Sequence, residues 1–190
     1  MVLNLLDKHC LMCHHCAIMK FEPYGPFELP RSNGGVDRSK KRSFWKSIET
    51  EYPSLPSAVG CYVFALKAAK GFKPWYVGKT EKQTFMAETW QPGKLLSYGE
   101  VIRVHNGKPM LFLLAKLTPQ GKFAKPTTRK IGAVTALEEM LIGICLQRNS
   151  ELLNKKTTRY LRRLQVPGYL NDSPGARPKN AKALARLLKT

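Results

Sequence analysis

Strand-like segments of hydrophobic residues occupy the middle of the chain. Residues 59–68 alternate and are rich in residues that favour strands, and residues 74–79 form a second such segment. Together they predict a hairpin whose strands are joined by a rather long loop over residues 67–72. The near-continuous apolar segment 110–117 has the length of a buried strand. The chain therefore predicts a small, mostly antiparallel, three-stranded sheet.

Helical spacing appears after the predicted strands. Residues 136–147 place apolar side chains at i, i+3, i+4, i+7 and i+8, which predicts an amphipathic helix. Residues 80–90 predict another helix, with Thr80 as its N-cap and Gln83 at the capping-box position. Residues 180–190 predict a short basic helix. The order strand, strand, helix, strand, helix and basic tail favours an α+β fold.

The 190 residues suit one domain with extensions. Residues 1–57 are expected to form an N-terminal arm, in which residues 20–35 are rich in Pro and Gly and are expected to be extended chain. Residues 58–156 hold the predicted strands and the main helix. Residues 157–190 are expected to form a basic C-terminal extension.

Charge narrows the choice of partner. Lys and Arg number 32 against 13 Asp and Glu, which gives a net charge of +19. Such an excess attracts polyanions such as DNA or RNA, although a structural basic protein would also carry it. The hydrophobic content of 43% suffices for a buried core. No apolar segment approaches the ~20 residues of a membrane span, and no secretory signal is apparent, so a cytoplasmic location is predicted.

Cysteine and histidine cluster near the N-terminus. The segment "KHCLMCHHC" (8–16) carries Cys10, Cys13 and Cys16 together with His14 and His15. Cys10 and Cys13 have the spacing of half a zinc site, but a second pair of ligands at a distance is not found in the sequence. We therefore expect a peripheral segment here, with zinc as the less favoured reading.

The two hairpin strands carry a recognisable pattern. "GCY" (60–62) is followed after thirteen residues by "YVG" (76–78), and the pair resembles the signature of the GIY-YIG nucleases. "LEEMLIG" (137–143) resembles the metal-binding helix of that family, and "LLN" (152–154) resembles the Asn motif that follows it. The resemblance covers about residues 58–156.

The resemblance implies a metal-dependent endonuclease that hydrolyses nucleic-acid phosphodiesters, with DNA favoured over RNA. In this reading Tyr62 activates or orients water, and Tyr76 holds the phosphate or its water. Glu138 binds one Mg²⁺ or Mn²⁺ ion, and Asn154 belongs to the site. Phosphodiester cleavage does require charge stabilisation at the phosphate oxygens, and Mg²⁺ prefers oxygen ligands such as a carboxylate.

A cation near the tyrosines is the missing part of the pattern. The resemblance implies an Arg on the helix after the second strand, but residues 80–90 contain none. Lys79 or Lys82 is expected to stabilise the phosphate charge instead, or an Arg such as Arg103 or Arg129 reaches in from elsewhere. The remaining alternative is a catalytically inactive nucleic-acid-binding module that retains the fold.

Further contacts with nucleic acid are predicted from charge. Gly78 would allow close approach of the backbone to a phosphate. Phe44 and Trp45 lie within a basic segment, where they would either stack on bases or pack onto the domain. The basic residues predicted to bind the nucleic-acid backbone are Lys40, Lys41, Arg42, Arg129, Lys155, Lys156, Arg159, Arg162 and Arg163. The sequence gives no indication of oligomeric state.

Overall fold

The computed structural model describes residues 18–32, 34–69, 71–154, 156–167 and 178–188. Residues 19–155 form one compact unit, and the described residues from 156 onward belong to a second one. The N-terminal Cys/His cluster and Lys155 lie outside the described residues, so the reading of zinc at that cluster stays untested. No helix among the described residues has both the length and the apolar character of a membrane span.

A four-stranded antiparallel sheet forms the centre of the larger unit. Its order is β1-β6-β4-β5, with β1 at Phe21–Glu28, β4 at Gly60–Ala68, β5 at Gly71–Thr80 and β6 at Lys108–Lys116. The α+β class and the antiparallel sheet are confirmed, but the prediction of three strands was wrong. The additional strand β1 lies in the segment expected to be extended chain.

The sequence analysis did not predict β1 as a strand because it contains two prolines, Pro23 and Pro26. Proline cannot donate to a hydrogen-bond ladder, so it normally argues against a central strand. β1 tolerates both because it lies at the edge of the sheet and pairs only with β6.

The β4–β5 hairpin is longer and tighter than predicted. β4 continues to Ala68 and β5 begins at Gly71, and these two residues pair. The loop expected over 67–72 is therefore mostly strand. A register shift after Phe64 gives room for Pro74 in β5, at the other edge of the sheet.

The register divides the side chains of this hairpin between the two faces of the sheet. Tyr62 pairs with Gly78 and Phe64 with Tyr76, whereas Cys61 pairs with Lys79 and Val63 with Val77. Paired residues share a face and successive residues alternate. Tyr62, Phe64, Tyr76 and Gly78 therefore face one side of the sheet, and Cys61, Val63, Val77 and Lys79 face the other.

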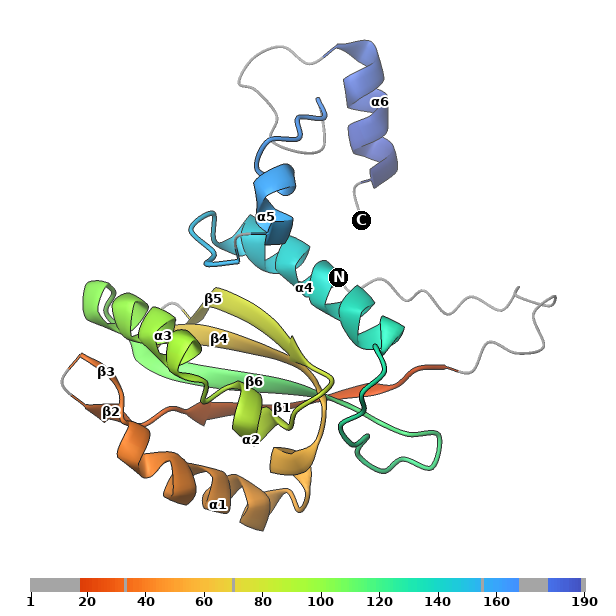
Figure 1. The fold of residues 1–190 in the computed structure, drawn as a ribbon. Helices are drawn as coiled ribbons and strands as arrows, with labels where there is room; N and C mark the ends of the chain where they lie inside the picture. Colours follow the sequence, from red (N-terminus) through yellow and green to blue (C-terminus); the bar gives the residue numbers. More distant parts are fainter. Residues whose placement is uncertain (1–17, 33, 70, 155, 168–177, 189–190) are drawn as a thin grey trace. The chain divides into compact units, whose positions relative to one another are not determined.

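Helices cover both faces (Figure 1). The larger core lies on the Tyr62 face, where α1 (Lys41–Glu51), α2 (Phe85–Glu88) and α3 (Pro92–Val104) bury their apolar residues. The smaller core lies on the Val77 face beneath α4 (Gly132–Arg148). A short hairpin of β2 (Arg31–Ser32) and β3 (Gly35–Val36) adjoins α3. The second unit contains α5 (Lys156–Leu161) and α6 (Lys179–Leu188).

The helices differ from the prediction after β5. The helix expected over 80–90 is reduced to α2, and Thr80 is the last residue of β5 rather than an N-cap. Thr84 caps α2 by accepting from the backbone N–H of Ala87. The sequence analysis missed α3, which contains two glycines, although its buried residues Leu95, Tyr98, Val101 and Ile102 recur at helical spacing. Its signal was Pro92, since proline favours the first turn of a helix.

Phe44 and Trp45 belong to the core rather than to a stacking surface. Trp45 is buried in the larger core, and Phe44 packs against that core and against Trp90, with 5.0 Å between the ring centroids. The basic segment around them forms α1, which turns these two aromatic rings toward the sheet. The packing alternative of the sequence analysis is the one observed.

Gly78 provides a test of the hairpin packing. An added Cβ at Gly78 would lie 2.3 Å from Cζ and 2.4 Å from Oη of Tyr62. Because the Tyr62 ring is fully buried and cannot move aside, Gly78→Ala is expected to lower the free energy of unfolding by about 1–3 kcal/mol. Urea titration measures this change. Gly132→Ala is the control, since nothing lies within 4 Å of its Cβ position; equal stability of the two variants would contradict the packing argument.

Candidate functional site

The two signature tyrosines lie together on the larger-core face. Tyr62 is central in β4, Tyr76 is on the edge strand β5, and their ring centroids are 6.1 Å apart. Tyr98 from α3 lies below, with its centroid 6.0 Å from that of Tyr76. The register places Tyr76 diagonally from Tyr62, opposite Phe64. Both rings lie near Lys94 of α3.

Lys94, in the first turn of α3, supplies a cation beside both tyrosines. Its Nζ lies 3.4 Å from the Tyr76 hydroxyl, to which it donates, and 5.6 Å and 5.3 Å from the ring centroids of Tyr62 and Tyr76. These distances are those of cation–π contacts. The Lys94 ammonium also forms an ion pair with Glu88 at 2.9 Å. We call Tyr62, Tyr76, Lys94 and Glu88 the tyrosine–lysine cluster.

The electrostatics keep Lys94 protonated. Burial lowers the pKa of the Lys94 ammonium, but the hydrogen bond to Glu88 and the neighbouring Tyr76 raise it, and the net shift is upward. The sequence analysis named Lys79, Lys82, Arg103 and Arg129 as possible cations and missed Lys94, because α3 itself was not predicted. The available signal was its position just after Pro92, in the first turn of a helix.

The two tyrosines differ in their access to solvent. Tyr62 is fully buried, and its hydroxyl lies beneath Gly78. Burial raises the pKa of Tyr62 strongly, so this hydroxyl holds its proton at neutral pH. That geometry does not suit the activation of water. Tyr76 is only half-buried and is therefore the tyrosine of the pair that an incoming group can reach.

Glu138 and Lys79 form a separate cluster. Lys79 Nζ lies 3.1 Å from Glu138 Oε2 and 3.9 Å from Glu81 Oε2, and it donates to Thr135 Oγ1 at 2.8 Å. Glu81 in turn accepts from the backbone N–H of Ile131, the N-cap residue of α4, at 2.6 Å. These contacts tie α4 to β5. Since Lys79 faces the smaller core, the cluster lies on the face of the sheet opposite to the tyrosines.

The surroundings of Glu138 do not suit a divalent metal ion as they stand. The Lys79 ammonium already occupies the space among the carboxylates of Glu138 and Glu81 and the Thr135 hydroxyl. A metal ion there would have to displace the Lys79 side chain. Within the described part of the chain, His, Cys, Asp and Glu do not form a group of three or more that could hold a metal.

Asn154 forms hydrogen bonds with the backbone of β5, the strand that carries Tyr76. Its Oδ1 accepts from the N–H of Val77 at 2.9 Å, and its Nδ2 donates to the C=O of Val77 at 2.7 Å. Asn149 donates to the C=O of Pro74 at 2.8 Å, and the N–H of Leu153 donates to the C=O of Trp75 at 2.9 Å. The segment after α4 therefore runs along β5, and Asn154 positions the strand that carries Tyr76.

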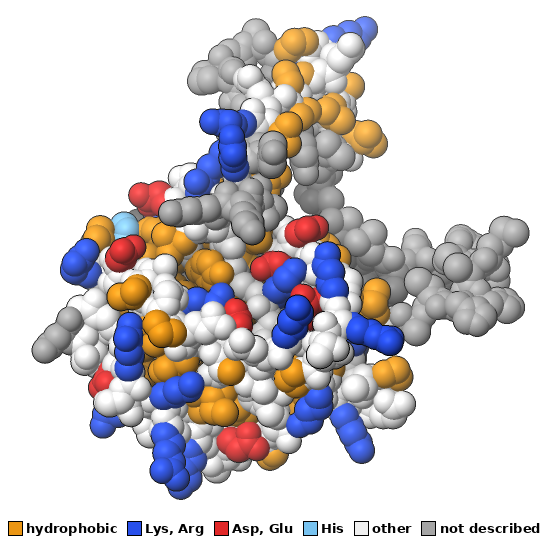
Figure 2. All heavy atoms as spheres, in the orientation of Figure 1, with side chains coloured by type: hydrophobic (Ala, Val, Ile, Leu, Met, Phe, Trp, Pro, Cys, Tyr) orange, Lys and Arg blue, Asp and Glu red, His pale blue; other side chains and the backbone are white. Residues whose placement is uncertain are grey.

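The other predicted residues are dispersed. Lys82 is exposed in the turn after β5, and Gly78 approaches the Tyr62 ring rather than an open surface. Lys40 and Arg42 are exposed near the start of α1, Lys41 is half-buried there, and Arg129 is exposed before α4. Figure 2 shows Lys and Arg side chains spread over one face of the larger unit. In the second unit, Arg159, Arg162 and Arg163 are exposed, while the Lys156 side chain lies outside what the structure describes.

Comparison with known proteins adds no relative: no family model, curated protein or solved structure matches this chain. The GIY-YIG resemblance therefore rests on the residues quoted above. The chemistry has to be argued from the tyrosine–lysine cluster and the Lys79–Glu138 pair themselves.

Asn154→Ala tests the positioning of β5. The substitution removes two hydrogen bonds to a partly buried backbone, so the free energy of unfolding is expected to fall by about 2 kcal/mol. Chemical denaturation followed by circular dichroism measures it. Asn106→Ala, at an exposed position before β6, is the matched control and is expected to leave stability unchanged. A loss no larger than that of the control would show that the two bonds to Val77 do not hold the strand.

Proposed function

We propose that this chain binds nucleic acid, with DNA preferred to RNA, through the tyrosine–lysine cluster. The observation that carries the proposal is the position of Lys94, whose ammonium lies 3.4 Å from the hydroxyl of the half-buried Tyr76. A cation next to a phenol hydroxyl offers a phosphate oxygen one charge-assisted and one neutral hydrogen bond. The net charge of +19 would draw a polyanion to the molecule.

The members of the cluster take different parts in this proposal. Lys94 and Tyr76 contact the phosphate. The buried Tyr62 is a positioning residue, since its ring supports both of them from below. Glu88 holds the ammonium when no ligand is present, because the two groups form an ion pair on a half-buried surface. A bound phosphate then competes with Glu88 for the Lys94 ammonium.

Lys94→Met tests the proposal. The variant is expected to bind a fluorescein-labelled duplex about tenfold more weakly than the wild type at moderate salt, because a charge-assisted contact is lost. The slope of log K against log salt is expected to fall in magnitude by about one. Fluorescence anisotropy at several salt concentrations measures both quantities.

Lys46→Met is the control for Lys94→Met, since Lys46 is exposed on α1 and lies outside the cluster. Equal weakening by the two variants would mean that only overall charge matters, and the cluster would not be the site. Glu88→Gln is expected to bind at least as tightly as the wild type, because the competing carboxylate is gone. Absence of binding by the wild type to either DNA or RNA would overturn the proposed function.

A metal-dependent endonuclease is the second candidate. It is favoured by the ordered signature together with Lys94, which offers the cation that residues 80–90 lack. In this candidate Lys94 stabilises charge on the phosphate oxygens and the Tyr76 hydroxyl exchanges a proton with the reacting groups. Because Lys79 occupies the space at Glu138, we derive no step through a metal ion.

A plasmid-nicking assay with Mg²⁺ or Mn²⁺ tests the endonuclease. The candidate predicts nicking by the wild type that Lys94→Met reduces at least a hundredfold and that Lys46→Met retains, since Lys46 is exposed on α1 outside the cluster. No nicking by the wild type with either ion would reject the endonuclease and leave the binding function. Equal rates for the two variants would remove Lys94 from the catalytic site.

A further inference from the structure

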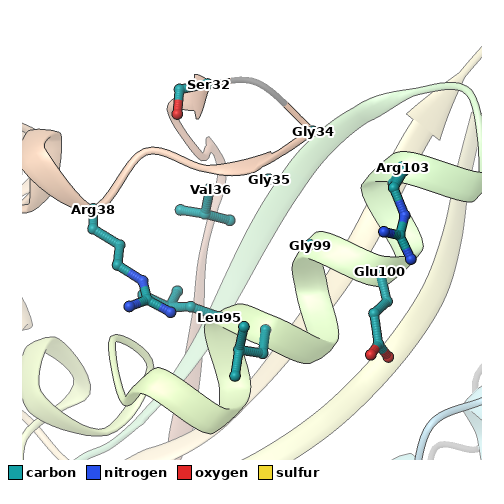
Figure 3. Close-up of a pocket in the computed structure, with 10 residues that line it drawn as sticks. Ser32, Gly34, Gly35, Val36, Arg38, Leu95, Gly99, Glu100 and Arg103 are labelled. Carbon is teal, nitrogen blue, oxygen red and sulfur yellow. The ribbon is translucent and has the colours of Figure 1, made fainter.

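A cavity of about 400 Å³ lies between the β2–β3 hairpin and α3, away from the tyrosine–lysine cluster. Figure 3 shows its lining: Gly34 and Gly35 on the hairpin, Gly99 on α3, and Arg38 and Arg103 at two sides. Val36 and Leu95 are buried beneath it. The proposed function uses none of these residues.

Three glycines lie where the hairpin approaches the helix. A Cβ added to Gly99 would meet Cα of Gly35 at 3.7 Å and the carbonyl oxygen of Gly34 at 3.8 Å. Gly34 also has a φ of +86°, a backbone conformation that residues with side chains rarely adopt. The backbone of the hairpin is therefore held against α3 with space left beside it, and that space is the cavity.

The charged groups of the cavity favour an anion. Its lining contains two arginines and one acidic residue, Glu100. Arg38 and Arg103 are 65 positions apart in the chain, and both line this cavity. Among the described residues, neither forms an ion pair. A guanidinium offers a planar fork of N–H donors that matches two oxygens of a phosphate. Ser32 adds a hydroxyl to the same lining.

We propose that this cavity, the arginine pocket, binds a second phosphate group of the nucleic-acid strand that occupies the tyrosine–lysine cluster. This inference rests on the proposed function. Lys94 and Arg103 belong to the same helix, nine residues apart, which is about 13 Å along the helix axis and half a turn around it. The two sites therefore lie on opposite sides of α3, and a strand bound at both would cross that helix.

The experiment compares variants that remove an arginine of the pocket with a variant that fills the cavity. Binding of a labelled 12-nucleotide single strand and of the matching duplex is measured by anisotropy. Arg38→Ala and Arg103→Ala are each expected to weaken binding about tenfold. Arg148→Ala, an exposed arginine at the end of α4, is the matched control and is expected to change affinity less than twofold.

Gly99→Leu fills the cavity while both arginines and the net charge remain. Its Cβ makes only ordinary contacts, so the variant is expected to fold and yet to bind as weakly as the arginine variants. Gly99→Ala is its control, with alanine favouring the helix and leaving most of the space. Wild-type affinity of a folded Gly99→Leu variant would overturn the arginine pocket.

Failure of this inference is distinguishable from failure of the proposed function. If Lys94→Met weakens binding but the two arginine variants and Gly99→Leu do not, only the arginine pocket is rejected. If the wild type binds no nucleic acid, both are rejected. A titration with AMP separates two sources of phosphate: binding of AMP that Gly99→Leu abolishes would identify a free-nucleotide site and overturn the assignment to a strand.

Discussion

The packing of the Tyr62 ring against Gly78 is the constraint on which the rest of the arrangement depends. A buried ring can lie across the neighbouring strand only where that strand carries no side chain, and the hairpin register puts Gly78 there. A slip of one residue would exchange the two faces of the hairpin. Tyr76 would then leave Lys94, and Lys79 would leave α4. The register thus holds both charged clusters at once.

Each of these clusters joins one lysine to carboxylates, on opposite faces of the same strand pair. Lys79 lies between α4 and β5 with Glu138 and Glu81, and Lys94 lies between α3 and the tyrosines with Glu88. A partly buried charge is costly without a partner, so each carboxylate is stabilised by its lysine. The two clusters differ in their other members. The Lys94 cluster includes the hydroxyl of the half-buried Tyr76, and the Lys79 cluster includes the N-terminal turns of α4.

Local patterns predicted the elements whose sequence matches their environment. β4 and β6 carry regular apolar spacing, and the sequence analysis found both. It also found α4 as a helix, but the predicted apolar face was partly wrong, since Met140 and Ile144 are exposed and Ile142 is buried. β1 was missed because edge strands accept prolines that the pattern treats as breaks. α3 was missed because its two glycines weaken the helical signal, and one of them, Gly99, lies against the β2–β3 hairpin.

The candidate site was only partly predictable for a similar reason. Tyr62 pairs with Gly78 within a single hairpin. This pairing could be predicted because both residues lie within a short range of the sequence. Which lysine would meet the tyrosines depends on the path of α3 across the sheet, which the residues between 80 and 90 do not reveal. The partner of Glu138 could not be predicted either, because Lys79 is distant in sequence and belongs to another element.

The contacts along β5 have a consequence for association between chains. An open sheet edge offers unpaired backbone groups to strands of other molecules. Here Asn149, Leu153 and Asn154 already occupy the outward groups of residues 74, 75 and 77, while the opposite edge is β1, interrupted by its prolines. The addition of a strand from another molecule is therefore discouraged at both edges of the sheet. This protects a chain with a hydrophobic content of 43% against edge-to-edge aggregation.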